Sequence, residues 1–123
     1  MNDPVRLVLP EPPSSNRLWR VCAGRAVKSE QARAYAQMVR AHFLTTLPAS
    51  ERRRLPFTGP VSVCLAWHRA RRMGDLDNRS KSALDALRGL VFVDDKQVVR
   101  LTLTRHEAPK HGRLEVVVMP EAA

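Results

Sequence analysis

The sequence lacks any apolar run long enough to cross a membrane. Its uninterrupted apolar runs are short, as at Leu90 to Val93 and Val116 to Met119. A transmembrane helix needs about 20 such residues, and the apolar core of a signal peptide needs roughly 7–15. The sequence therefore predicts a soluble, cytoplasmic protein without a membrane partner.

Cysteine and aromatic residues are also scarce. The two cysteines, Cys22 and Cys64, form no closely spaced pair, so neither a zinc site nor a disulfide framework is indicated. Both lie in segments expected to be buried or strand-like, where we expect reduced thiols in or near the core. Aromatic residues make up 5% of the chain and do not alternate with basic residues. This pattern argues against a stacking platform for single-stranded nucleic acid.

Basic residues, by contrast, are abundant. Lys and Arg outnumber Asp and Glu by 21 to 12, which gives a formal net charge of +9 and favours polyanionic partners such as nucleic acid or an anionic membrane surface. The 123 residues contain no Pro/Gly/Ser-rich linker, so we expect one domain over residues 1–123. A domain of this size often gains stability from a partner subunit, which makes self-association plausible.

The hydrophobic periodicity predicts a small mixed β-sheet with two helices packed on it, an α/β (α+β) fold. The first helix begins after an N-cap at Ser29 and ends before Pro48, and the second follows Asp77 and ends near Gly89. An exposed connection is expected at Glu51 to Arg54. Strands are predicted at Val5 to Leu9, Val61 to His68, Val98 to Leu103 and Leu114 to Met119, with a hairpin around Ala23-Gly24 and a hairpin connection between the last two strands at residues 109–112.

The segment after the Val61 strand concentrates carboxylates. In an extended stretch, residues two apart project to the same side, so Asp75 and Asp77 converge while Leu76 turns into the core. A third carboxylate from Asp94-Asp95 would bring like charges together unless a hard divalent cation neutralises them. Oxygen ligands suit Mg²⁺, with Mn²⁺ as a possible substitute. Such an ion polarises a phosphoryl oxygen and supplies hydroxide near neutral pH, and the pattern leaves one metal or two open.

Basic residues near this segment have two interpretations each. Asp77 and Lys81 are four apart, and Asp85 and Arg88 continue the same helical stripe. These residues form either ordinary ion pairs beside an N-cap aspartate, or, at Lys81, an ammonium group that holds the scissile phosphate. On the first helix Arg33, Gln37 and Arg40 are either a solvated face or a contact to the DNA backbone.

The spacing Asp75-x-Asp77-Asn78-x-x-Lys81, then Asp85-Ala86-Leu87, then Asp94-Asp95-x-Gln97-Val98 is similar to the signature of the RusA family of Holliday-junction resolvases. Further motifs in the same order also resemble that family and extend the resemblance over nearly the whole chain. They are Pro12-Pro13-Ser14-x-Asn16-Arg17, Arg25 and Ser29, and Gly112-Arg113-Leu114-Glu115.

The resemblance implies a small α/β domain that forms a two-fold homodimer. It also implies a crossover junction endodeoxyribonuclease, bacterial or phage-encoded, that nicks four-way DNA junctions symmetrically with Mg²⁺ in recombination and repair, without a small-molecule cofactor. By the same resemblance Asp75, Asp77 and Asp95 are the essential metal-binding carboxylates, and Lys81 is the basic residue beside them. Asp94 is the lesser candidate, because only one of two adjacent side chains faces the metal in an extended conformation.

The resemblance leaves the DNA contacts open. Arg69, Arg71 and Arg72 are the nearest candidates for phosphate contacts, or else they belong to a solvated basic loop. Asn16 and Arg17 follow a rigid proline pair, and either reach toward DNA or the metal site or only form a turn. Two other functions remain: a non-catalytic DNA-binding dimer, and a metal-dependent nuclease for other branched DNA.

Overall fold

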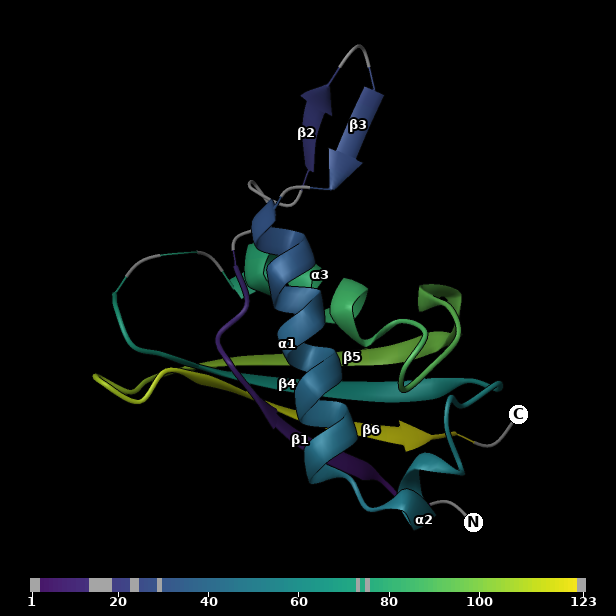
Figure 1. Ribbon diagram of the computed structural model, residues 1–123. Helices are drawn as coiled ribbons and strands as arrows, with labels where there is room; N and C mark the ends of the chain where they lie inside the picture. Colours follow the sequence, from purple (N-terminus) through teal and green to yellow (C-terminus); the bar gives the residue numbers. More distant parts are fainter. Residues whose placement is uncertain are drawn as a thin grey trace.

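The structure is a computed structural model that describes residues 3–13, 19–22, 25–28, 30–72, 74 and 76–121, without the side chains of residues 19–22, 25–28, 77 and 78. Figure 1 shows a sheet with helices on one side and a separate hairpin. The elements follow in the order β1 (Val5–Leu9), β2 (Trp19–Cys22), β3 (Arg25–Lys28), α1 (Glu30–Thr46), α2 (Ala49–Arg52), β4 (Val61–Arg69), α3 (Leu76–Leu87), the 3-10 helix η2 (Asp95–Gln97), β5 (Val98–Glu107) and β6 (Arg113–Pro120).

The main sheet has the strand order β1-β6-β4-β5. Strand β6 pairs antiparallel with β1 and with β4, while β5 pairs parallel with β4. Parallel neighbours need a crossover connection, and α3 supplies it between β4 and β5. The mixed sheet and its two long helices confirm the predicted fold class.

The predicted hairpin between the last two strands is wrong. Strands β5 and β6 do not pair, because β4 lies between them. The connection at residues 108–112 instead crosses the end of β4, where the amide of Ala108 donates to the carbonyl oxygen of Arg69 at 2.9 Å. The physical reason lies in burial: β6 alternates between buried and half-buried side chains, as a central strand does, whereas β5 is exposed along most of its length and forms the sheet edge.

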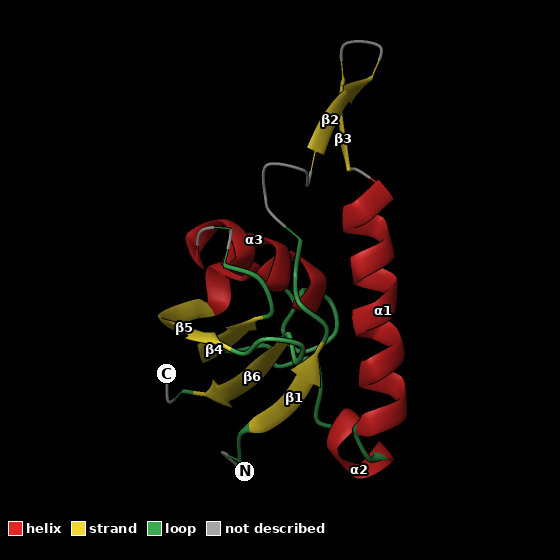
Figure 2. Cartoon of the chain, turned by 90° about the vertical axis from the view of Figure 1, so that its left-hand side faces the viewer, coloured by secondary structure: helices red, strands yellow, loops and turns green. Residues whose placement is uncertain are grey.

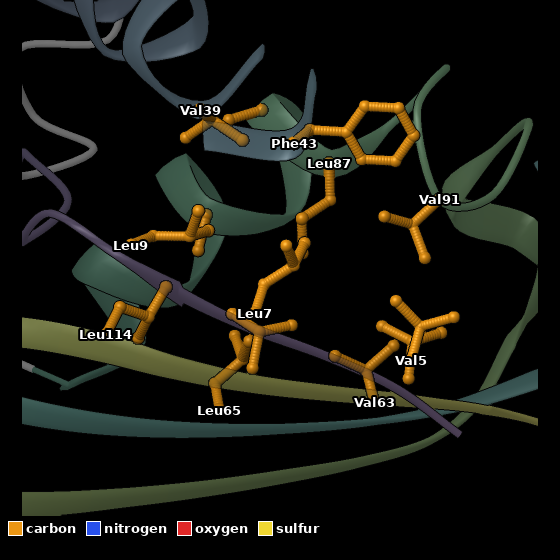
Figure 3. Close-up of a cluster of buried hydrophobic side chains, with 14 of the residues drawn as sticks. Val5, Leu7, Leu9, Val39, Phe43, Val63, Leu65, Leu87, Val91 and Leu114 are labelled. Carbon is orange, nitrogen blue, oxygen red and sulfur yellow. The ribbon is translucent and has the colours of Figure 1, made fainter. Parts of the chain in front are cut away.

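The core lies between the sheet and the two long helices. Figure 3 shows side chains of β1, α1 and α3 pointing toward one another over the inner face of the sheet. The largest fully buried side chain is Trp67 of β4, with 1% exposure. The members of the buried cluster that Figure 3 labels are Val5, Leu7, Leu9, Val39, Phe43, Val63, Leu65, Leu87, Val91 and Leu114.

The opposite face of the sheet is not covered by the helices (Figure 2). Cys64 lies on this face and is an exposed free thiol, so the expectation of a core or near-core thiol is wrong for Cys64. The reason is the two-residue alternation of β4, in which Val63 and Leu65 take the buried face and Cys64 takes the other. The stacked rings of His68 and His106, with centroids 4.6 Å apart, lie on the same face.

The remaining predicted elements are present. The hairpin of β2 and β3 is confirmed, with Trp19 opposite Lys28, and it projects away from the sheet (Figures 1 and 2). Its predicted turn at Ala23-Gly24 and the predicted N-cap Ser29 lie outside the described residues. The expected connection at Glu51 to Arg54 begins inside a short helix, α2, that was not predicted. No helix in the described ranges is long and apolar enough to cross a membrane.

Candidate active site

The candidate site lies around α3 and the segments at its two ends. Strand β4 ends at Arg69, and residues 70–75 lead into α3. Gly74 has a positive φ of 98°, and a Cβ there would meet the Arg79 guanidinium at 2.8 Å. A non-glycine residue at position 74 would therefore disturb the packing of this turn against the first turn of α3.

The structure changes the expected geometry of the first two carboxylates. Helix α3 begins at Leu76 rather than after Asp77, so the backbone of Asp77 is helical and the extended spacing assumed for Asp75 and Asp77 does not hold there. Leu76 is half-buried and packs against the core, as expected. Asp75 itself, and the side chain of Asp77, lie outside the part of the chain that the structure describes.

The extended segment from Pro10 to Pro13 is tied to three elements around the site. The Tyr35 hydroxyl of α1 donates to the Pro10 carbonyl oxygen at 2.8 Å. The Ser82 hydroxyl of α3 donates to the Pro13 carbonyl oxygen at 2.6 Å. The Arg79 guanidinium donates to the Pro12 carbonyl oxygen and lies over the Trp67 ring, 5.1 Å from its centroid. These contacts fix the chain directly before residues 14–18, which include the predicted DNA contacts Asn16 and Arg17 and lie outside the described residues.

Glu11 attaches the same Pro10 to Pro13 segment to the sheet. Its carboxylate accepts hydrogen bonds from the Trp67 indole at 2.9 Å and from the Ala70 amide at 3.2 Å. Gly112 lies directly against the Glu11 carboxylate, and a Cβ at Gly112 would overlap it. The glycine of the Gly112-Arg113-Leu114-Glu115 motif therefore leaves room for the Glu11 carboxylate in its present position. Sequence reasoning missed Glu11 and Arg79, because their partners are 56 to 67 positions away along the chain.

Three arginines at the end of β4 and directly after it, Arg69, Arg71 and Arg72, have different surroundings. The Arg69 Nε lies 2.7 Å from Glu107 Oε1 on the neighbouring strand β5, and its side chain is 11% exposed. This hydrogen bond is also the main cause that lowers the pKa of Glu107. Arg71 and Arg72 are exposed at the bend before α3. Arg71 and Arg72 are therefore better placed than Arg69 to contact a phosphate.

The loop after α3 is built around Gln97. The Gln97 side-chain oxygen accepts hydrogen bonds from the amides of Val93 and Asp94, both at 2.8 Å. Its amide nitrogen donates to the carbonyl oxygens of Phe57 and Gly59, both at 2.8 Å. Asp94 caps η2 by accepting from the Lys96 amide at 3.1 Å. This cap gives Asp94 a structural role and agrees with its place as the lesser candidate for a ligand.

Asp95 follows this cap and is exposed, in the first position of η2 rather than in an extended stretch. Its pKa is raised above the ordinary value, first by partial desolvation and then by the charges of Asp94 and Asp85, while Arg88 opposes the rise. Asp95 therefore lies near the last turns of α3, where Asp85 and Arg88 form an ion pair at 3.1 Å. A raised pKa in a carboxylate beside other carboxylates is typical of a site that a cation stabilises.

The remaining predicted residue, Lys81, is exposed on α3. Lys81 and Asp85 are one helical turn apart, as Asp77 and Lys81 are, so the three share one face of the helix. The described side chains, which do not include those of Asp75 and Asp77, contain no group of three or more His, Cys, Asp or Glu residues that could hold a metal ion. The exposed Asp95 carboxylate supplies oxygen donors of the kind that a hard divalent cation prefers.

Comparison with known proteins identifies the family. A family model described as Endodeoxyribonuclease RusA matches residues 10–119. The chain belongs to the RusA family. Similar RusA proteins, each named crossover junction endodeoxyribonuclease RusA, occur in Shigella sonnei (strain Ss046) with 35% identity over 114 residues, in Escherichia coli (strain K12) with 34% over 114 residues, and in Enterobacteria phage 82 with 33% over 118 residues. Each match covers 91% of this chain and 91% of the relative.

The match to the RusA family model confirms the resemblance that the aspartate motifs indicated. The matched region covers every predicted catalytic residue, from Asp75 to Asp95, and both segments of predicted DNA contacts. In this RusA-family chain the motif residues divide into two groups. Gln97, Asp94 and Gly112 hold the local structure through contacts described above, whereas Lys81 and Asp95 are exposed on the surface.

Proposed function

We propose that the protein is a crossover junction endodeoxyribonuclease that resolves four-way DNA junctions by paired symmetric nicks in recombination and repair. Membership of the RusA family carries this proposal. The exposed Asp95 carboxylate beside charged groups of α3 supports it. In a bacterial cell or a phage-infected one, the protein acts in the cytoplasm as one RusA-like domain.

We propose Asp75, Asp77 and Asp95 as the ligands of Mg²⁺, with Mn²⁺ as a substitute. A RusA-family nuclease implies a divalent metal in general, and oxygen donors favour Mg²⁺ among the available cations. When bound, this ion polarises a phosphoryl oxygen and provides a nucleophilic hydroxide. Lys81, which extends into solvent from α3, balances the negative charge that develops on the scissile phosphate. No small-molecule cofactor is required.

The DNA contacts in this proposal come from the basic surface at the ends of the site. Arg71 and Arg72 are exposed beside α3 and contact the phosphate backbone. Asn16 and Arg17 follow the anchored proline pair and reach the same strand. Arg69 supports the bend, because its guanidinium is held by Glu107. Recognition of the branch point then depends on the shape and deformability of DNA rather than on extensive base contacts.

We propose that the protein acts as a homodimer, because paired symmetric nicks need two equivalent active sites. Two copies related by a two-fold axis present two equivalent sites to two symmetry-related strands of a junction. The face of the sheet that the helices leave uncovered carries exposed apolar side chains that a second copy could cover. Val8 is 57% exposed there and Met119 is 38% exposed. Single nicks by a monomer would leave the junction unresolved.

The test is nicking of a mobile four-way junction and of a linear duplex of the same sequence, each with Mg²⁺ and with chelator. Paired cuts in the junction alone, only with Mg²⁺, are the expected result. Cutting of linear DNA or flaps would keep a metal nuclease and remove the junction assignment. Binding without cutting in Mg²⁺ and Mn²⁺ would favour the non-catalytic DNA-binding dimer.

A further inference from the structure

A groove of about 310 Å³ separates α1 from α3 on the outside of the molecule. The two helices pack against each other, and the small side chains of Ala36 and Ala86 line the groove between them. Figure 2 shows the two helices on the same side of the sheet, with α1 along one flank. The groove opens to solvent, and one of its lining residues, Asp85, is one helical turn from Lys81.

Polar side chains from both helices line this groove. Gln37 and Arg40 come from α1, and the α3 pair consists of Asp85, in α3, and Arg88, directly after its last residue. Gln37 and Arg40 belong to the polar stripe of α1, and the α3 pair continues the stripe of Lys81, since residues three or four apart share a helix face. Two charged stripes that are separate in the sequence therefore meet along one groove.

The charges in the groove favour an anion. Arg88 neutralises Asp85 through the 3.1 Å ion pair, which leaves the positive charge of Arg40. In the part of the chain that the structure describes, no carboxylate forms an ion pair with the Arg40 guanidinium. Arg40 is exposed, so its guanidinium is accessible to a ligand in the groove. A planar guanidinium with several donors matches the geometry of a phosphate group.

We propose that the groove between α1 and α3 binds the phosphodiester backbone of the DNA strand that passes the candidate active site, with Arg40 as the main phosphate contact and Gln37 and Arg88 beside it. This inference rests on the proposed function. Arg88 lines the groove and also forms a β-bridge with Phe92, in the loop that leads to Asp95, so a strand in the groove is directed toward the carboxylates. Asp85 limits the affinity, because it adds a negative charge to a phosphate site.

The test compares the salt dependence of junction binding by the full chain, in chelator so that no cutting occurs, for the unchanged protein and for Arg40→Gln. Loss of one phosphate contact lowers the slope of log K against log salt by about one and weakens binding uniformly across junction sequences. Because a homodimer loses one contact in each subunit, Arg40→Gln is expected to lower the slope by about two for the dimer, and Arg40→Lys, which keeps the charge, is expected to retain most of it. Arg40 is exposed, so folding is not at risk.

Arg53 provides the matched control. It is exposed and follows α2, at the end of α1 that is remote from the hairpin (Figure 2). Arg53→Gln removes the same charge and is expected to leave the slope unchanged. If Arg40→Gln leaves the slope unchanged, or if Arg53→Gln lowers it equally, the groove proposal is overturned while junction cutting by the unchanged protein still stands. If the unchanged protein neither binds nor cuts junctions, the proposed function itself fails.

Discussion

The carboxylate of Glu11 accepts a hydrogen bond from the indole of Trp67, with 2.9 Å between Oε2 and Nε1. Trp67 is the largest fully buried side chain in the core, and its N–H is a donor that the core itself does not satisfy. The same carboxylate accepts from the Ala70 amide at the end of β4. One side chain from the first loop thus holds the point where the chain leaves the sheet for the candidate site.

Glu11→Ala is expected to destabilise the protein by about 1–3 kcal/mol, because it leaves a buried indole donor and a backbone amide without their acceptor. Glu11→Gln keeps one acceptor oxygen and is expected to cost less. Urea unfolding followed by fluorescence measures both changes. Equal stability of Glu11→Ala and the unchanged protein would mean that water replaces the carboxylate without loss.

Gly112→Ala is expected to be destabilising because its Cβ would overlap the Glu11 carboxylate. The cost is specific to that neighbour. In the Glu11→Ala background the same substitution is therefore expected to cost less, so a double-mutant cycle of unfolding free energies gives a coupling between the two positions. Purely additive effects would contradict the close approach as the cause.

Gln97→Ala is expected to abolish most junction cutting while leaving junction binding near normal. Its side chain makes four hydrogen bonds, two of them to the segment at Phe57 and Gly59. Without them the turn that carries Asp95 loses its support, and displacement of a catalytic group by about 1 Å costs roughly 100-fold in rate. Single-turnover cutting and equilibrium binding separate the two effects, and the comparison variant is Asp94→Asn, which keeps a capping oxygen and the Gln97 hydrogen bonds but removes one charge.

Asp95→Asn is expected to abolish cutting and to stabilise the protein at neutral pH in chelator. The folded-state pKa of Asp95 is raised above its ordinary value of 3.8, mainly by desolvation. A raised carboxyl pKa favours the folded state below that ordinary value, and this contribution is lost as the pH rises through the folded-state pKa. Thermal unfolding at several pH values checks this: the advantage of Asp95→Asn should grow from acid to neutral pH. An advantage that does not change with pH would contradict it.

Much of the fold is predictable because the patterns that mark a strand or a helix lie within short stretches of the sequence. The alternation of Val61, Val63, Leu65 and Trp67 with more exposed neighbours identifies β4 and its buried face. The helical spacing of Tyr35, Val39 and Phe43 identifies α1. The pairing of the strands was harder to predict. Strands that follow one another in the sequence usually pair as a hairpin, but β5 and β6 do not. Only the burial of β6 on the sheet interior, against the exposure of β5, places β4 between them.

The candidate site was predictable to the extent that its residues are close in sequence. The spacing of Asp75, Asp77 and Lys81 and the Asp94-Asp95 pair led to the family, which the comparisons confirm. The residues that hold these segments were not predictable in the same way. The sequence pointed to Gln97 as a motif residue and to Arg40 as a possible DNA contact, but not to the bond of Gln97 with Phe57 or to the groove that Arg40 lines with Arg88, because these depend on distant segments.

The pairing of β1 with β6 has a consequence for synthesis of the protein. Val5 to Leu9 leave the ribosome early, yet their partners are Val118 to Leu114, which are made much later. Because β6 also separates β1 from β4, the nascent chain has no strand for β1 to join until β6 has emerged. Folding into this sheet is therefore delayed until after most of the chain is translated. The segment after β1, which the hydrogen bonds of Glu11 attach to β4, therefore reaches its final place only once β6 is present.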